Sequence, residues 1–156
     1  MSSCRLFSAI LLLTCLACAT RSTIPSDIGG SVADGGTLTL TVEIHGLESD
    51  EGSVAVALFD STASFDQRTD AVASQAVLPK DGLATWSVVD IPAGVYAVAV
   101  FHDLNDNGEL DRSTLGPPSE PYGFSTDASG TFGPPKFNRA AIELRPGEKT
   151  IRLQVR

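Results

Sequence analysis

The sequence contains no cysteine after residue 18 and comparatively few basic side chains. All three cysteines, Cys4, Cys15 and Cys18, lie near the N-terminus, so the rest of the chain has neither a disulfide nor a thiol nucleophile. The 11 lysine and arginine residues are outnumbered by 19 acidic residues, which gives a formal net charge of −8. This balance argues against nucleic-acid binding, because a basic surface supplies most of the affinity of such proteins.

Sequence motifs of the common enzyme classes are also missing. The chain has no Gly-x-Ser-x-Gly sequence, no cysteine–histidine pair beyond the N-terminal segment and no glycine-rich phosphate-binding loop. Hydrophobic residues make up 42% of the chain and aromatic residues only 6%, so a core must be filled mainly by valine, leucine, isoleucine and alanine. These absences predict a non-enzymatic domain.

The first 19 residues have the organisation of a secretory signal peptide. Arg5 precedes a short apolar segment at residues 6–13, and small residues follow at Ala17 and Ala19. This apolar segment is too short to remain as a membrane-spanning helix. We therefore expect export of the chain, with no membrane attachment other than a lipid anchor.

The cleavage site can be read in two ways. The sequence Ala17-Cys18-Ala19 fits the small-x-small rule of ordinary signal cleavage. The same region resembles the end of a bacterial lipoprotein box, which would leave Cys18 lipidated, although Cys15 stands where such boxes usually carry leucine. The first reading predicts a soluble periplasmic or secreted protein, and the second predicts a periplasm-facing outer-membrane lipoprotein.

Residues 20–36 are rich in serine, threonine, glycine and aspartate and are expected to form a flexible tether. From residue 37 onwards apolar and polar residues alternate, as they do in half-buried strands. The folded domain is therefore expected over residues 37–156. We expect its strands at residues 37–45, 53–59, 71–78, 83–89 and 95–102, with two edge-like strands at the end of the chain.

About seven short strands, separated by turn sequences every ~8–12 residues, predict an all-β fold. The expected architecture is a single antiparallel β-sandwich of the prealbumin-like or immunoglobulin-like type, with an eight-stranded barrel as the alternative. Residues 53–59 and 95–102 are apolar on both faces. This pattern predicts that both segments lie at the centre of a sheet.

One long stretch, residues 112–139, is rich in proline and contains four aromatic residues, Tyr122, Phe124, Phe132 and Phe137. A long loop inside a compact domain is usually either functional or disordered, and four rings argue against disorder. Two interpretations remain. The rings close the open end of the sandwich, or they form a ligand surface for which Tyr122, Phe124 and Phe132 are the candidates.

The most informative segment is the acidic run at residues 103–111. Asp103, Asn105 and Asn107 place oxygen atoms at every second position, Gly108 follows, and Asp111 ends the run. In calcium loops, alternate side chains point towards a hard cation while a glycine makes the tight turn possible. The spacing therefore predicts a Ca²⁺ site.

On a calcium-loop register, Thr114 stands where a bidentate glutamate is expected, and Glu120 can supply the missing carboxylate. Oxygen ligands favour Ca²⁺ over zinc or copper. The predicted ligands are Asp103, Asn105, Asn107, the carbonyl of Glu109, Asp111 and Glu120. The alternative is a turn in which the same side chains accept hydrogen bonds from backbone amides.

His102 ends the most apolar strand, next to Asp103. It is either a structural strand-end residue or an acid/base group, and a carboxylate pair such as Asp111 and Glu120 can in principle hydrolyse a glycosidic bond. An unrecognised hydrolase is therefore the least favoured alternative. That hypothesis fails if His102 is buried and hydrogen-bonded only to backbone.

Several segments resemble a family of small exported bacterial proteins known only as domain of unknown function family 2141. The similar segments are residues 91–111, 116–120, 122–125 and 132–137, and the resemblance extends over roughly residues 38–155. It rests on the His-Asp-x-Asn-x-Asn-Gly sequence that begins at His102 and on Tyr-Gly-Phe-Ser from Tyr122. The resemblance implies an exported single domain of the prealbumin type and no enzyme activity that can be named.

The acidic run is also similar, more locally, to the calcium loops in B-type repeats of bacterial surface proteins, sandwich modules that become rigid when they bind the ion. Together these features predict an exported, non-enzymatic, calcium-stabilised β-sandwich that interacts with an envelope protein or a glycan. The alternative function is a small-molecule or glycan carrier with the aromatic loop as its lid. An apolar pocket beneath Phe124 and Phe132 would favour that alternative.

Overall fold

The structure, a computed structural model, describes residues 35–113, 116, 118–130 and 133–156. The described residues all belong to one compact unit of the chain, Val32–Arg156. The predicted signal peptide, the lipidation site Cys18 and most of the tether lie outside the described residues, so they stay predictions. In the part of the chain that is described, no helix is long and apolar enough to cross a membrane.

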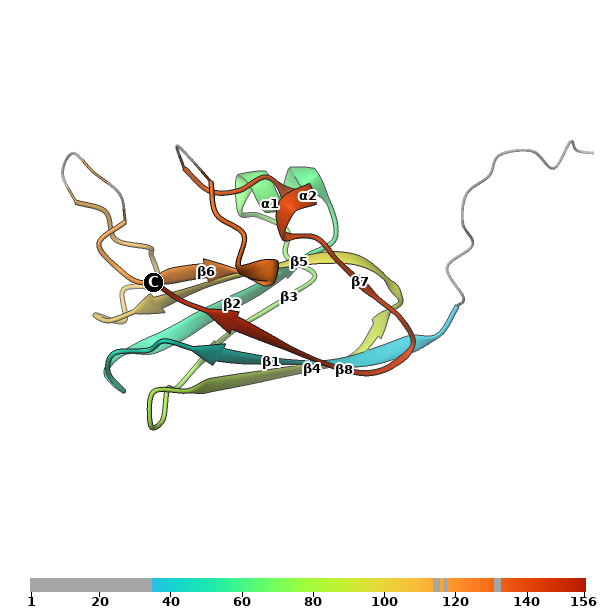
Figure 1. The fold of residues 1–156 in the computed structure, drawn as a ribbon, viewed down its shortest axis with the longest axis horizontal. Coiled ribbons are helices and arrows are strands. Elements are labelled where there is room, and N and C mark those ends of the chain that lie inside the picture. Colours follow the sequence, from blue (N-terminus) through green and yellow to red (C-terminus); the bar gives the residue numbers. More distant parts are fainter. Residues whose placement is uncertain (1–34, 114–115, 117, 131–132) are drawn as a thin grey trace, which may run out of the picture. The chain divides into compact units, whose positions relative to one another are not determined.

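The described residues form eight strands and three short helical segments (Figure 1). The strands are β1 (Thr37–His45), β2 (Ser53–Phe59), β3 (Ala73–Val77), β4 (Ala84–Pro92), β5 (Gly94–Asp103), β6 (Tyr122–Phe124), β7 (Ile142–Leu144) and β8 (Gly147–Gln154). The helical segments are α1 (Thr62–Gln67), the 3₁₀ turn η1 (Ser125–Asp127) and α2 (Phe137–Ala140). The stretch predicted as one long irregular loop therefore contains β6, η1 and most of α2.

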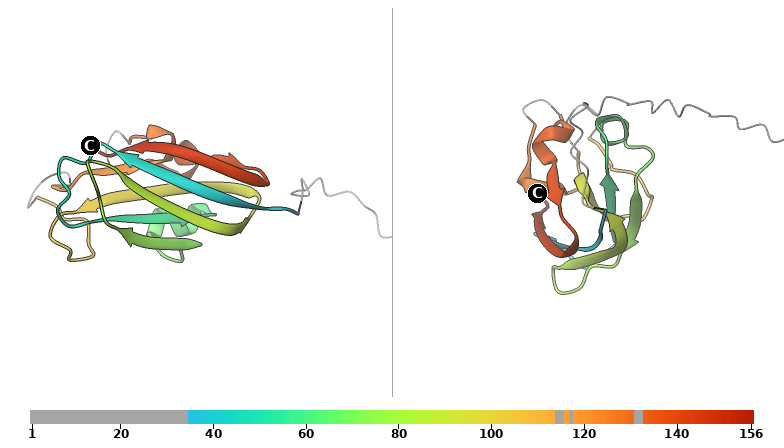
Figure 2. Two further views of the ribbon diagram at one scale, coloured as in Figure 1. Left: turned by 90° about the horizontal axis from the view of Figure 1, so that it is seen from below. Right: turned by 90° about the vertical axis from the view of Figure 1, so that its right-hand side faces the viewer.

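The strands form two sheets (Figures 1 and 2). One sheet has the order β4-β1-β8, and the other has the order β3-β2-β5-β6, with β7 paired to the start of β5. The all-β, two-sheet fold and the central position of β2 and β5 confirm the sequence predictions. One pairing differs from the expected antiparallel arrangement, because β8 runs parallel to β1. These strands are separated by almost the whole domain, so no hairpin turn fixes their relative direction.

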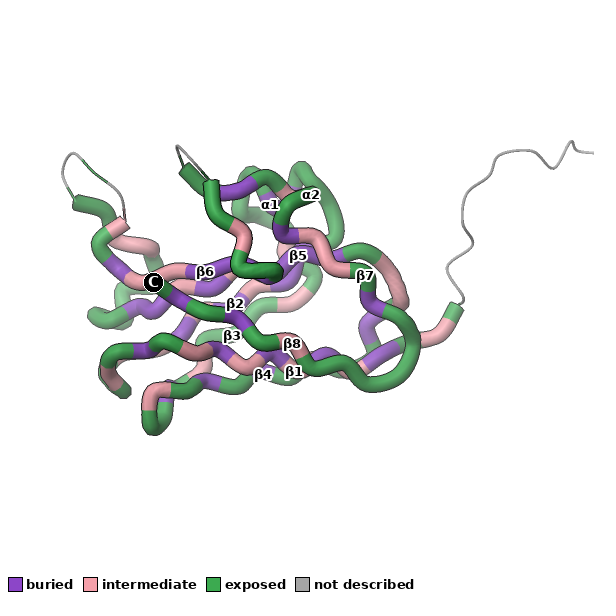
Figure 3. Tube along the Cα trace, in the orientation of Figure 1, coloured by how far each residue is buried: buried purple, intermediate pink, exposed green. Residues whose placement is uncertain are grey.

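The main core lies between the two sheets and follows the period-two pattern of the strands. In β1, Leu38, Leu40, Val42 and Ile44 are buried while the intervening side chains are partly exposed (Figure 3). The facing sheet contributes mainly valine and leucine, and the tryptophan of β4 completes the cluster: Val54, Val56, Leu58, Val98, Val100 and Trp86. Full burial of each valine or leucine side chain contributes about 1.5–3 kcal/mol, so this layer is the main source of stability.

The larger sheet has a second apolar face, which points away from this core. A separate cluster covers one end of that face, where Phe65 packs edge-to-face on Phe59 and Phe124 with ring centroids 5.6 and 5.8 Å apart. Helix α1 brings Phe65 to this position. The helix begins at Ser61, whose hydroxyl accepts a hydrogen bond from the Ser64 amide. The two helices contact each other over this end of the sheet (Figure 1).

The Tyr-Gly-Phe-Ser sequence forms β6 and joins the two sheets. The backbones of Tyr122 and Arg156 exchange two hydrogen bonds of 3.1 Å, which connect β6 to the end of β8. Gly123 allows this approach, because a β-carbon there would collide with the backbone oxygen of Gln154 and lie 2.7 Å from the Leu153 side chain. The Ser125 hydroxyl accepts a hydrogen bond from the Val98 amide at 2.9 Å and donates to the Ala140 carbonyl. The motif is therefore a structural junction.

We predict that Gly123→Ala destabilises the domain by about 1–3 kcal/mol, because the new methyl group overpacks the contact between β6 and β8. Denaturant unfolding of both proteins would measure the difference. Gly35→Ala is the matched control, since a β-carbon at residue 35 has no atom within 4 Å. Equal stability of the two variants would show that the junction between the sheets does not depend on this close approach.

Candidate functional site

The acidic loop begins where β5 ends, and Asp103 organises its backbone. This carboxylate is 3% exposed. One of its oxygens accepts a hydrogen bond from the Asn107 amide at 3.1 Å, and the other accepts from the Gly108 amide at 2.7 Å. Gly108 has a φ of +80°, a left-handed conformation that glycine adopts without steric cost. Asp103 therefore holds the loop folded back over the end of β5.

Glu120, which was expected from the sequence to be able to supply a further carboxylate to this loop, reaches the loop from the segment before β6. Its carboxylate is 5% exposed and accepts hydrogen bonds from the amides of Leu104 and Asp111, at 2.9 and 3.0 Å. The two buried carboxylates together accept four backbone amides. Hydrogen bonds to a charged acceptor are stronger than neutral ones, so this network holds both ends of the loop.

The remaining predicted ligands contact one another on the exposed side of the loop. The side-chain amides of Asn105 and Asn107 donate to the two oxygens of Asp111, at 2.8 and 3.1 Å. The Asn107 oxygen accepts a hydrogen bond from the Glu109 amide at 2.7 Å. The structure thus gathers the predicted ligands into one loop, in the hydrogen-bonded arrangement that the sequence analysis gave as the alternative to a cation site.

Metal binding in this loop stays a prediction. Across the described residues, no group of three or more histidine, cysteine, aspartate or glutamate side chains is placed to hold a metal ion. A bound Ca²⁺ would take oxygen ligands from the carboxylates that now accept amide hydrogens, using their second lone pairs. The Glu109 side chain lies elsewhere, because it lines the groove described below.

His102 is fully buried on the inner side of β5, and its Nε2 atom lies 2.8 Å from the Glu51 carbonyl. No hydrogen-bond partner of its Nδ1 atom is found among the residues described. Among the described residues the His102 ring is therefore hydrogen-bonded only to backbone, and its burial separates it from a substrate at the surface. The hydrolase hypothesis was expected to fail if His102 had this geometry, so the structure argues against that hypothesis. The carboxylate of Glu120 already accepts hydrogen bonds from backbone amides.

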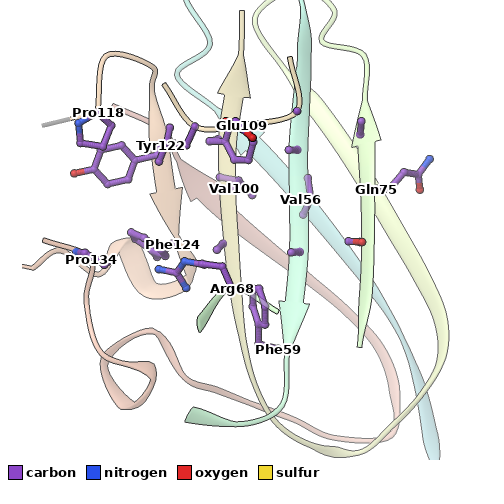
Figure 4. Close-up of a pocket in the computed structure, with 18 of the residues that line it drawn as sticks. Val56, Phe59, Arg68, Gln75, Val100, Glu109, Pro118, Tyr122, Phe124 and Pro134 are labelled. Atoms are coloured by element: carbon purple, nitrogen blue, oxygen red, sulfur yellow. The ribbon is translucent and has the colours of Figure 1, made fainter. Parts of the chain in front are cut away.

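A groove of about 650 Å³ lies on the outer face of the larger sheet (Figure 4). Its floor is made of small side chains from β2, β3 and β5, namely Ala55, Ala57, Ala76 and Ala99. Its walls are larger and come from several segments: Phe59, Phe101, Tyr122, Phe124, Pro118 and Pro134. Glu109 and Pro118 lie towards one end and Arg68 and Phe59 towards the other (Figure 4).

The aromatic residues predicted to form a ligand surface or to close the sandwich differ in their burial and in their packing partners. Phe124 is 6% exposed and belongs to the cluster around Phe65, yet it also lines the groove. Tyr122 is half-buried and packs against Phe124 with ring centroids 5.9 Å apart. Phe137 packs against Phe65 from the other side. Phe132 lies outside the described residues, so its predicted role in ligand contact stays a prediction.

The alanines of the groove floor and Arg68 were not predicted from the sequence as site residues. A signal for the floor was present, because β2 and β5 carry valine and leucine on one face and alanine on the other. The larger side chains occupy the core, and the alanines leave space on the outer face. Arg68 follows a short helix, and its position against the sheet depends on how that helix packs, for which the sequence gives no signal.

Comparison with known proteins gives this chain a family. A family model described as an uncharacterized protein conserved in bacteria (DUF2141) matches residues 42–152. The chain belongs to the DUF2141 family. No curated protein matches it. Among solved structures, a mutant of the pilus-presented adhesin Spy0125 (Cpa) is similar, with 14% identity and a TM-score of 0.24 over 78% of this chain and 27% of the adhesin chain. That similarity is too low to carry an argument about function.

We predict that Asp103→Asn lowers the free energy of unfolding of this DUF2141 domain by about 1–3 kcal/mol, measured in the presence of a chelator. The substitution replaces one acceptor oxygen by an amide donor that faces a backbone N–H. Asp106→Asn is the matched control in the same exposed loop. Asparagine tolerates the left-handed backbone at residue 106, so its effect should stay within about 0.5 kcal/mol. Equal effects would mean that Asp103 has no special structural role.

The calcium prediction is tested separately by calorimetric titration of Ca²⁺ into chelator-treated protein, with Mg²⁺ as the control ion. If the prediction is right, one ion binds, the melting temperature rises with free Ca²⁺, and Asp111→Asn removes both effects. Asp106→Asn again serves as the control for loss of one charge. Absence of heat together with an unchanged melting temperature would contradict the prediction and leave the acidic loop as a hydrogen-bonded turn.

Proposed function

We propose that this domain is an exported, non-enzymatic binding module that holds a small, largely apolar molecule in the groove on the outer face of its larger sheet. The main observation that supports this proposal is the groove. Its volume of about 650 Å³ lies within the range of about 300–1,000 Å³ that is typical of small-molecule sites. Such sites are concave, mainly apolar and provided with a few polar groups, and this groove has each of these properties.

The chemistry of the lining supports an apolar ligand over a sugar. The floor consists of alanine methyl groups, and the walls are aromatic rings and prolines. A sugar bound there would leave many hydroxyl groups without hydrogen-bond partners, which is costly. The polar residues of the lining are Ser74 and Gln75 on the edge strand β3, Arg68 directly after α1, Glu109 in the acidic loop, Arg112 just after that loop and Tyr122 on β6. Flat or chain-like apolar molecules fit this lining better.

The arrangement of reactive groups supports binding in place of catalysis. His102 lies on the opposite face of β5 from the alanine floor, and among the described residues its ring is hydrogen-bonded only to backbone. The buried carboxylates of Asp103 and Glu120 are occupied by backbone amides. Within the described residues, the groove is therefore lined by side chains that can hold a ligand and lacks a nucleophile paired with a base.

The acidic loop has a defined place in this proposal, because Gly108, Glu109 and Leu110 line the groove. The hydrogen bonds of Asp103 and Glu120 fix the backbone on which these three residues lie. A preformed site does not need to be ordered by its ligand, which favours affinity. A cation bound by the acidic loop would strengthen the same rim, so the calcium prediction and the binding function are compatible and independent.

We predict that Ala99→Leu blocks the groove and weakens binding of the neutral probe N-phenyl-1-naphthylamine by about tenfold or more. The wild-type protein should show saturable probe fluorescence. Ala99 is partly exposed on the groove floor, so the added carbons fill space that the ligand would occupy. The fold should survive, because the new side chain enters the groove and leaves the core between the sheets unchanged.

The matched control is Thr85→Leu, which adds an apolar side chain on the exposed face of β4 in the other sheet. It should leave probe binding unchanged. Absence of saturable binding to the wild-type protein, or equal weakening by both variants, would contradict the proposed function.

A further inference from the structure

Arg68 is held against the wall of the groove by several contacts. It follows α1 with a left-handed backbone, φ = 56°, and its guanidinium donates to the Phe65 carbonyl. The guanidinium carbon lies 4.3 Å from the centroid of the Phe65 ring and 5.2 Å from that of Phe124. Stacking on two rings restricts the position of the charge. Figure 4 shows the Arg68 side chain between Phe124 and Phe59, at one end of the groove.

This charge has no carboxylate partner among the described residues. The ion pairs found there connect Glu43 to His45 and Arg152, and Glu143 to Arg145. Asp66 acts on Arg68 electrostatically, but it is exposed on α1 and does not line the groove. Partial burial lowers the pKa of Arg68 more than Asp66 raises it, and the group still remains charged.

A cation that rests on aromatic rings beside an apolar floor favours a particular kind of ligand. Arginine has five N–H donors in a planar fork, and the contact with Phe65 leaves donors available. The fork matches the two oxygens of a carboxylate. The groove also contains one acidic and one further basic residue, Glu109 and Arg112, whose charges offset each other. A single anionic group is therefore best placed at Arg68.

We propose that the groove binds an amphiphilic monocarboxylate, with its apolar body on the alanine floor and its carboxylate on Arg68. This inference rests on the proposed function and names the ligand class. One arginine neutralises one carboxylate. A dianionic phosphate ester would meet more repulsion than a monocarboxylate from a chain with a net charge of −8, which disfavours it.

The test compares dodecanoate with methyl dodecanoate, two ligands with the same apolar chain and different head groups. Wild-type protein should bind dodecanoate about tenfold or more tightly than the neutral ester, as expected for a charge-assisted contact. Arg68→Met keeps an apolar stem at residue 68 and should remove the preference. Arg68→Lys keeps the charge and should restore part of it. Calorimetry gives the affinities, and thermal unfolding checks that each variant is folded.

The methyl signals of carbon-13-labelled alanine separate failure of this inference from failure of the proposed function. Ala57 and Ala99 lie on the groove floor, whereas Ala84 is buried in the core between the sheets and serves as an internal control. Shifts of the floor methyls with either ligand, but equal affinities for acid and ester, would overturn the carboxylate assignment and leave the groove as a binding site. No shift with either ligand would overturn both proposals.

If Arg68→Met fails to fold, the comparison of the two ligands on wild-type protein still tests the preference for a carboxylate, and Arg68→Lys, which should keep only part of that preference, tests the role of Arg68. If the acid binds more tightly than the ester, the preference should also fall when added salt screens the charge. A preference that Arg68→Met leaves intact would assign the anion to another cation of the groove and contradict the role of Arg68.

Discussion

The outer face of the central strands β2 and β5 is the constraint on which the rest of the domain depends. Both strands are apolar on both faces, and only the inner face is buried by the second sheet. The outer face must be covered by something else, and Phe65 from α1 and Phe124 from β6 cover one end of it. The remaining part has alanines where larger residues would fill space, so the residues that the structure describes leave a groove there instead of a second core.

The acidic loop and the groove are structurally coupled. Asp103 and Glu120 are buried carboxylates that accept backbone amides, and such groups are tolerated inside a protein only when they are fully hydrogen-bonded. Their network sets the path of residues 104–111, part of which forms the rim of the groove. A change at Asp103 or Glu120 would therefore reach the proposed ligand site through the loop backbone, because neither of these two carboxylates lines the groove.

The segments that carry the family resemblance are mainly architectural in this structure. His102 ties β5 to the Glu51 carbonyl, Gly123 lets β6 approach β8, and Ser125 connects β5 to the end of α2. Arg68, on which the proposed carboxylate contact depends, lies outside those segments. Membership of the DUF2141 family, whose description is only that of an uncharacterized protein, therefore gives no ligand, and the proposed ligand class rests on the groove.

The sequence by itself determined the local elements. Period-two alternation located the first five strands to within a few residues, and the two-faced apolar pattern placed β2 and β5 at the centre of a sheet. The spacing of Asp103, Asn105 and Asn107 marked a tight loop organised by side-chain oxygens, because such contacts are local. Tertiary structure alone decided the parallel direction of β8 and the position of Arg68 over the rings of Phe65 and Phe124. Each of these features joins segments that no short-range pattern connects, so packing of the whole domain was needed to bring them together.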